Sequence, residues 1–338
     1  MQRNAYFDNA RLLFITLVVF GHLLQPFVAG SEVLGSLYTW IYTFHMPAFI
    51  MIAGYFAKGA KDPAYIGTLA KKLLIPYVIF QIIYTIYYFL IDKKGWLVDS
   101  IFYPHWSLWF LFSLFCWHLL LILYRKMPAL TGIGIAVLLG VIIGYFDKVG
   151  HMFSLSRTFV FFPYFLIGYW LSEKHINVLK QRKFQVASIL ILMTTAALVY
   201  YLPHINSGWL LASQSYSSLG VEYTGSIYRF SVYLTSLLIA FSVLALVPRR
   251  RFSFTVLGER TLYVYLLHGF IVQYFRQGEI LQVNNIIEFI GILVLSIFIV
   301  VILSSKFIMT VTEPIIEIST KRFNRFMEKR RMETGSQK

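Results

Sequence analysis

Ionisable side chains inside long apolar segments are the residues of most chemical interest, because burying such groups in lipid is costly unless they are paired or useful. Arg11 and His22 are eleven residues apart. At ~3.6 residues per turn this is about three turns, so a helix carries both on one face, ~16 Å apart. Asp8 and Gln25 lie on the same stripe, three residues beyond each end. This helix is therefore predicted to turn its polar stripe toward the interior of a bundle.

Three histidines are predicted to lie at similar depth. His22, His45 and His268 each stand about ten or eleven residues into an apolar segment, or ~15–16 Å from its entry. No carboxylate or cysteine accompanies them at ligand spacing, so no metal is expected. His118, beside Trp117, lacks a polar stripe and is interpreted as structural.

A histidine deep in the predicted helix and an arginine near its cytoplasmic end suggest two kinds of chemistry. A neutral imidazole suits a general base that removes a proton from a substrate hydroxyl. A guanidinium suits a phosphate, because it forms bidentate contacts with phosphate oxygens. A donor with cytoplasmic phosphates and a reactive group near His22 would fit both residues. A transporter of an anionic lipid would fit them equally well.

The composition indicates the solvent in which these residues must work. The chain has 338 residues, of which 58% are hydrophobic and 13% charged, whereas soluble proteins carry about a quarter charged residues. Its mean hydropathy is +0.67. An aromatic content of 18% argues against disorder, and a single cysteine, Cys116, excludes an intramolecular disulfide. These values predict a membrane protein.

Apolar segments fill most of the chain. We predict an all-α, polytopic integral membrane protein with about ten transmembrane helices in one bundle, formed by residues 1–312, followed by a basic cytoplasmic tail, 313–338. The first segment contains Arg11 and His22 and lacks a small-x-small cleavage site, so it is not expected to be a signal peptide. The ten segments are approximately 11–29, 34–56, 73–91, 106–124, 128–145, 157–172, 184–202, 228–247, 258–275 and 286–308.

The distribution of Lys and Arg predicts the orientation. A cytoplasmic N-terminus puts 24 of the 30 on the inside, and an even number of spans puts both termini there. Topology and contact with anionic membrane lipid thus account for the basic charge, and no nucleic acid partner is expected. We predict a multi-pass protein of the cell membrane. Six basic residues remain outside: Lys93, Lys94, Lys148, Arg157, Arg229 and Arg276.

Two outer features have alternative interpretations. Trp106 and Trp109 suit an interfacial aromatic belt, with a binding role as the less favoured interpretation. The 203–227 loop, which contains Trp209 and Tyr216 along with Glu222 and Tyr223, is either an acceptor-binding surface or a connector.

Several blocks together resemble the membrane-bound acyltransferase family 3. Asp8–Arg11 and Val19–His22 look like its opening motif, with the Arg-x10-His spacing. Phe44–Phe56 is similar to its second-helix block, although Ala53 stands where many members have Ser. Further blocks that resemble the family are Ser107–Leu111, Phe161–Gly168, Leu257–His268 and Glu313-Pro314.

The resemblance implies an integral acyltransferase that moves an acyl group, usually acetyl, from cytoplasmic acyl-CoA. The acceptor implied is a hydroxyl of an extracytoplasmic glycan or lipid-linked sugar. His22 matches the family's essential histidine and Arg11 its partner arginine. His22 would act as a base or become acylated. The transfer would finish within the bundle or on a separate, unidentified partner protein. A flippase or exporter of an amphipathic anion remains the alternative. Residues expected to contribute to substrate or cofactor binding are Asp8, His45, Phe49, Gly54, Trp109 and His268.

Overall fold

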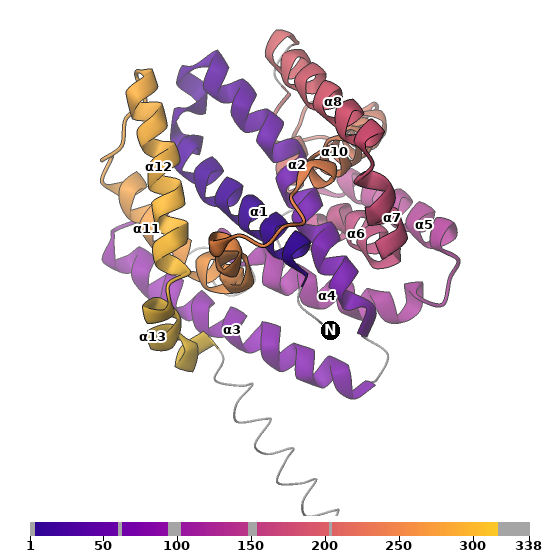
Figure 1. Ribbon diagram of the computed structural model, residues 1–338, viewed down its shortest axis with the longest axis horizontal. Coiled ribbons are helices and arrows are strands. Elements are labelled where there is room, and N and C mark those ends of the chain that lie inside the picture. Colours follow the sequence, from indigo (N-terminus) through magenta and orange to yellow (C-terminus); the bar gives the residue numbers. More distant parts are fainter. Residues whose placement is uncertain (1–3, 60–62, 94–102, 148–153, 203–204, 317–338) are drawn as a thin grey trace, which may run out of the picture.

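The computed structural model describes residues 4–59, 63–93, 103–147, 154–202 and 205–316, and every regular element within these ranges is helical. Ten helices, numbered α1 to α12 with α7 and α9 as short connectors, cover the ten predicted apolar segments (Figure 1). They are α1 (Ala5–Leu24), α2 (Glu32–Phe56), α3 (Pro63–Leu90), α4 (Trp109–Tyr124), α5 (Ala129–Ile142), α6 (Leu155–Trp170), α8 (Arg182–Tyr201), α10 (Gly225–Leu246), α11 (Thr261–Gln277) and α12 (Ile286–Leu303).

Five helical stretches among the described residues are long and apolar enough to cross a membrane by themselves. The expectation of an all-helical membrane protein is therefore confirmed, while the number of ten crossings stays a prediction. The five stretches are Ala5–Gly30, Tyr65–Leu90, Arg182–Tyr201, Gly225–Leu246 and Ile286–Leu303.

Short elements join the long helices. The 3-10 helix η1 (Gln25–Gly30) continues α1, and η3 (Ile143–Tyr145) continues α5. The others are η2 (Ala57–Gly59), α7 (Glu173–Leu179), α9 (Gly208–Leu211), η6 (Ser253–Arg260) and α13 (Lys306–Ile316). Helix α13 crosses the expected start of the tail at residue 313, and residues 317–338 lie outside the described ranges.

Helix α1 begins six residues earlier than the apolar segment predicts. The Asn4 side chain accepts the Tyr6 amide hydrogen at 3.0 Å and so caps the helix. The polar residues of the first turns then find partners in the chain: the Tyr6 hydroxyl donates to the Leu244 carbonyl at 2.9 Å, and Asn9 donates to the Arg250 carbonyl at 2.9 Å. Helix α1 also ends earlier than the predicted limit at residue 29, at Leu24, so His22 lies in its last turn and not in its middle.

The two ends of the bundle differ in charge. We call the end where α1 begins and α2, α6, α10 and α12 finish the basic end, and the opposite end the loop end. At the basic end, Lys58 donates to the Leu171 carbonyl, Lys180 to the Ala245 carbonyl at 2.7 Å, and Arg260 to that of Ser304 at 2.7 Å. Cations thus satisfy the last carbonyls of α6, α10 and α12, where the helix dipole favours positive charge.

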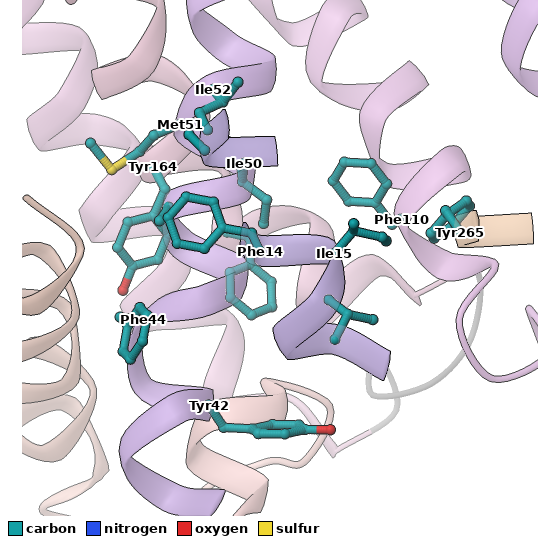
Figure 2. Packing of buried hydrophobic residues seen from close by; sticks show 14 of the residues in the cluster. Phe14, Ile15, Tyr42, Phe44, Ile50, Met51, Ile52, Phe110, Tyr164 and Tyr265 are labelled. Atoms are coloured by element: carbon teal, nitrogen blue, oxygen red, sulfur yellow. The ribbon is translucent and has the colours of Figure 1, made fainter. Parts of the chain in front are cut away.

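Helices α2 and α6 pack very closely against each other. A Cβ added to Gly54 would stand 2.0 Å from the Phe165 carbonyl oxygen, and one added to Gly168 would stand 1.9 Å from that of Met51. Two helices can approach this closely only where small residues face each other. Figure 2 shows Ile50 and Met51 of α2 near Tyr164 of α6.

Cysteine labelling tests the orientation that the charge distribution predicts. In a Cys116→Ser background, Glu222→Cys and Arg250→Cys place single thiols at exposed positions on the loop end and the basic end. A membrane-impermeant maleimide applied to whole cells should label position 222 and reach position 250 only after permeabilisation. Labelling of both positions from the same side would rule out the predicted orientation.

Packing between α2 and α6 predicts a stability effect at Gly54. Gly54→Ala should lower the thermal midpoint of the detergent-solubilised protein, because overpacking typically costs about 1–3 kcal/mol. Gly134→Ala in α5 is the matched control, since a Cβ there meets nothing within 4 Å. Differential scanning fluorimetry compares them. Equal midpoints for Gly54→Ala and the parent would contradict this packing role.

Candidate active site

An internal cavity of about 150 Å³ lies where α1, α2, α4, α6 and α11 meet. Helix α1 contributes Ile15, Val18 and His22, whose spacing of three or four residues puts them on one helix face, and Gln25 follows on the same face at the start of η1. The sequence therefore identified the inward face of α1 correctly, although it put His22 too early in the helix.

The His22 ring is held from three sides. Its Nδ1 is 3.2 Å from the Tyr42 hydroxyl. The ring centroid lies 4.2 Å from that of Trp106 and stacks at 5.7 Å on that of His268. These neighbours come from α2, from the segment before α4 and from α11, so tertiary packing fixes the orientation of the imidazole.

The other two predicted histidines have defined tautomers. Nδ1 of His45 lies 2.8 Å from the Ile41 carbonyl, and Nδ1 of His268 lies 2.9 Å from that of Val264. Since a carbonyl only accepts, both Nδ1 atoms carry hydrogen and both Nε2 atoms are acceptors. His45 lines the cavity, whereas His268 is fully buried behind Trp106 and His22. The expectation that all three histidines face one cavity is therefore wrong for His268, because Trp106 and His22 cover it.

Arg276, at the end of α11, supports His22 from behind. Its guanidinium donates to the His22 carbonyl at 2.5 Å and to Gln25 Oε1 at 2.7 Å. It also lies 5.3 Å from the Trp106 ring centroid. Sequence reasoning missed this residue, because it counted Arg276 only as an outer charge.

Arg157 is a second arginine near His22 that the sequence did not single out. It lies in the first turn of α6 and lines the cavity with His22. Its Nε donates to the Leu211 carbonyl at 3.0 Å, and its guanidinium lies 5.2 Å from the Trp109 ring centroid. Trp109 in turn stacks on Phe161 at 5.4 Å.

The remaining predicted residues divide into two groups. Phe49 and Trp109 line the cavity. Arg11 lies nearer the basic end, where it pairs with Asp8 at 2.7 Å and contacts the Phe56 ring. Gly54 lies in the α2–α6 contact. The structure therefore brings Phe49 and Trp109 to His22, but not Asp8, Arg11 or Gly54.

Both tryptophans that suit an aromatic belt contribute to this cavity. Trp106 adopts a positive φ of 38° immediately before α4. A tryptophan is rarely found in this left-handed conformation, so the surroundings of Trp106 hold it there. The less favoured interpretation of the Trp106–Trp109 pair, a binding role, thus gains structural support.

The 203–227 loop forms part of the cavity wall through Leu210 and Leu211. Trp209 is buried, and its carbonyl accepts from Arg229 at 2.6 Å. Hydrogen bonds from Ser215 and Ser217 lower the pKa of the Asp147 carboxyl, which joins this loop to the end of α5. The described part of this loop therefore forms part of the cavity wall.

The fold and the surroundings of His22 define an all-helical membrane protein with a cavity among its helices. Comparison with known families identifies the chemistry: residues 4–305 match the family model described as an acyltransferase domain. The chain belongs to this family, membrane-bound acyltransferase family 3, and it is an acyltransferase.

One curated relative is the nodulation protein NolL of Mesorhizobium japonicum. It is 24% identical over 315 residues, which cover 84% of this chain and 80% of the relative. No solved structure matches this chain.

The arrangement suits proton transfer and anion binding. Among the described residues, no three His, Cys, Asp or Glu side chains are close enough to hold a metal ion. The cavity instead combines the imidazoles of His22, which Tyr42 holds, and His45 with aromatic walls and one guanidinium. These side chains can position an uncharged carbonyl carbon next to a hydroxyl group that attacks it.

Removing the Tyr42 hydroxyl should reduce acyl transfer without unfolding the protein. Tyr42→Phe keeps the ring contacts but leaves His22 Nδ1 without its 3.2 Å partner. We expect turnover to fall about 10- to 100-fold with a small change in KM, because the base loses its preferred tautomer and orientation. Steady-state thioester consumption measures both constants. Unchanged turnover would show that Tyr42 does not orient the base.

Proposed function

We propose that this protein is an O-acyltransferase of the cell membrane that moves an acyl group, usually acetyl, from cytoplasmic acyl-CoA to a hydroxyl of a cell-envelope glycan or lipid-linked sugar. The observation that carries this proposal is His22, which lines an internal cavity and is oriented by Tyr42 and Trp106. The match to the acyltransferase family supplies the class of reaction.

The donor is proposed to approach from the basic end. Arg11 lies on the same face of α1 as Ile15, the α1 lining residue nearest the basic end, and one turn separates them, or ~6 Å. A guanidinium at this mouth can hold a phosphate of the donor while its acyl-bearing arm extends along α1 toward His22. Asp8 keeps Arg11 in place until the phosphate arrives.

The proposed chemical step uses the tautomer in which His22 Nδ1–H donates to the Tyr42 oxygen. His22 Nε2 then takes the proton of the acceptor hydroxyl, and the hydroxyl oxygen attacks the thioester carbonyl. The new C–O bond forms, the C–S bond breaks, and the departing thiolate takes the proton from the imidazolium. In the two-step alternative, Nε2 attacks the thioester carbonyl, the C–S bond breaks and the thiolate leaves. The acceptor oxygen then attacks the acyl carbon, the C–N bond breaks, and the hydroxyl proton passes to the thiolate.

A test of the division of labour compares variants at His22 and Arg11. His22→Ala should lower turnover of radiolabelled acetyl-CoA by about 10²–10⁴-fold and leave CoA binding largely intact. Arg11→Ala should weaken CoA binding, and Arg11→Lys should recover only part of it, because an ammonium cannot replace the bidentate fork. Isothermal titration of CoA measures the binding.

His175→Ala is the matched control for His22→Ala, because His175 is exposed at the basic end and does not line the cavity. It should retain parental turnover. If His22→Ala abolishes CoA binding while Arg11→Ala binds CoA normally, the proposed roles are wrong. A flippase would leave the thioester intact in every variant.

A further inference from the structure

The few cations at the loop end are engaged with aromatic rings. Of the six expected there, four are described, and each lies 4.1–5.3 Å from a ring centroid: Lys93 on Tyr88, Arg157 on Trp109, Arg229 on Trp209 and Arg276 on Trp106. Cations of the basic end, such as Lys58 on Tyr55, make the same kind of contact. The loop-end arginines must therefore be distinguished by their hydrogen-bond partners.

The three arginines differ in what their terminal nitrogens do. Arg229 donates through a terminal nitrogen to the Trp209 carbonyl, and Arg276 donates through one to His22 and Gln25. Arg157 is held instead through Nε, which donates to the Leu211 carbonyl. Of the three, only Arg157 lines the cavity. The two terminal nitrogens of its guanidinium are therefore the atoms that can bind a ligand in the cavity.

The cavity around Arg157 does not supply a counter-charge. None of the described residues that line it is Asp or Glu, and the described ion pairs involve other arginines. A cation held among aromatic and aliphatic side chains is unfavourable unless an anion accompanies it. Trp109 stabilises the guanidinium from one face, but a ring quadrupole compensates only part of a full charge.

The end of the bundle at which Arg157 lies indicates which of the two substrates carries the anion. Gly54 near the end of α2 contacts α6 at Phe165, so α6 runs from the loop end to the basic end and its first turn, with Arg157, lies at the loop end. Arg11 lies at the opposite end of the stripe on α1. The phosphates of a donor held by Arg11 are thus far from Arg157, and an anion at Arg157 enters from the acceptor side.

We propose that Arg157 binds an oxyanionic group of the acceptor, a phosphate or a carboxylate, and so selects acidic acceptors for acylation beside His22. This inference rests on the proposed function for the identity of the acceptor side. Guanidinium is suited to the task because its fork matches the two oxygens of a carboxylate or phosphate. The Trp109 face and the Leu211 carbonyl hold the fork in place before the ligand binds.

Binding of simple probes to the full chain in phosphatidylcholine nanodiscs tests the proposal. Octyl β-D-glucuronide is compared with octyl β-D-glucoside, and farnesyl phosphate with farnesol, by isothermal titration with empty nanodiscs subtracted. At least one anionic probe should bind about tenfold or more tightly than its neutral partner. Preference for the glucuronide indicates an acidic sugar as the source of the anion, and preference for farnesyl phosphate indicates a lipid-linked phosphate.

Variants assign the preference to Arg157. Arg157→Gln should bind each anionic probe no more tightly than its neutral partner, with the neutral affinities unchanged, and Arg157→Lys should keep part of the preference. Arg182→Gln is the matched control, because it removes the same charge from an exposed position at the start of α8 and should behave as the parent. An equal affinity of the parent for charged and neutral probes overturns the proposal, as does a preference that survives in Arg157→Gln.

The binding result is separate from the result on acyl transfer. If the parent prefers anionic probes through Arg157 but consumes no acetyl-CoA, the proposed enzymatic function fails and the anion site stands. If it consumes acetyl-CoA through His22 but shows no preference, the anion site fails and the proposed function stands. The parent alone decides the second case, even if Arg157→Gln does not fold.

Discussion

Close contact between α2 and α6 is the constraint on which the site depends. Gly54 and Gly168 let the two backbones approach so nearly that neither position has room for a Cβ. This contact lies toward the basic end and fixes the two helices against each other. Nearer the loop end both helices line the cavity, with His45 and Phe49 from α2 and Arg157 and Phe161 from α6. Gly54, which the motif suggested as a binding residue, thus lies in a packing contact and does not line the cavity.

Charge is used differently at the two ends of the bundle. At the basic end, Lys58, Lys180 and Arg260 satisfy the last carbonyls of descending helices, so the same residues that predict orientation also complete the secondary structure. At the loop end, the described arginines turn inward. Arg276 bonds the carbonyl of His22 and thereby holds the end of α1 where the imidazole must stand. A charge count along the sequence treats these two uses alike.

The sequence was sufficient to predict the class of protein. Its hydropathy, the ten apolar segments and the spacing of Arg11 and His22 predicted a helical membrane protein and the inward face of α1. The family blocks predicted an acyltransferase. Segment limits were less accurate, because hydropathy does not register that Asn4 caps α1 and that Tyr6 and Asn9 find partners on other segments. The sequence also missed the end of α1 at Leu24, where a 3-10 helix takes over, and so put His22 in the middle of its helix although it lies in the last turn.

What the sequence by itself determined, then, is local and periodic: which segments are apolar, which face of the first helix is polar, and which histidine begins the family motif. Only the tertiary structure decided which of the dispersed polar residues meet. Tyr42, Trp106 and Arg276 are 20, 84 and 254 residues from His22, yet all three contact it. The same holds for Arg157, whose role depends on Trp109 and on Leu211 from a loop 54 residues later. No periodicity links such residues, because helix packing across the bundle, and not the spacing along one helix, brings them together.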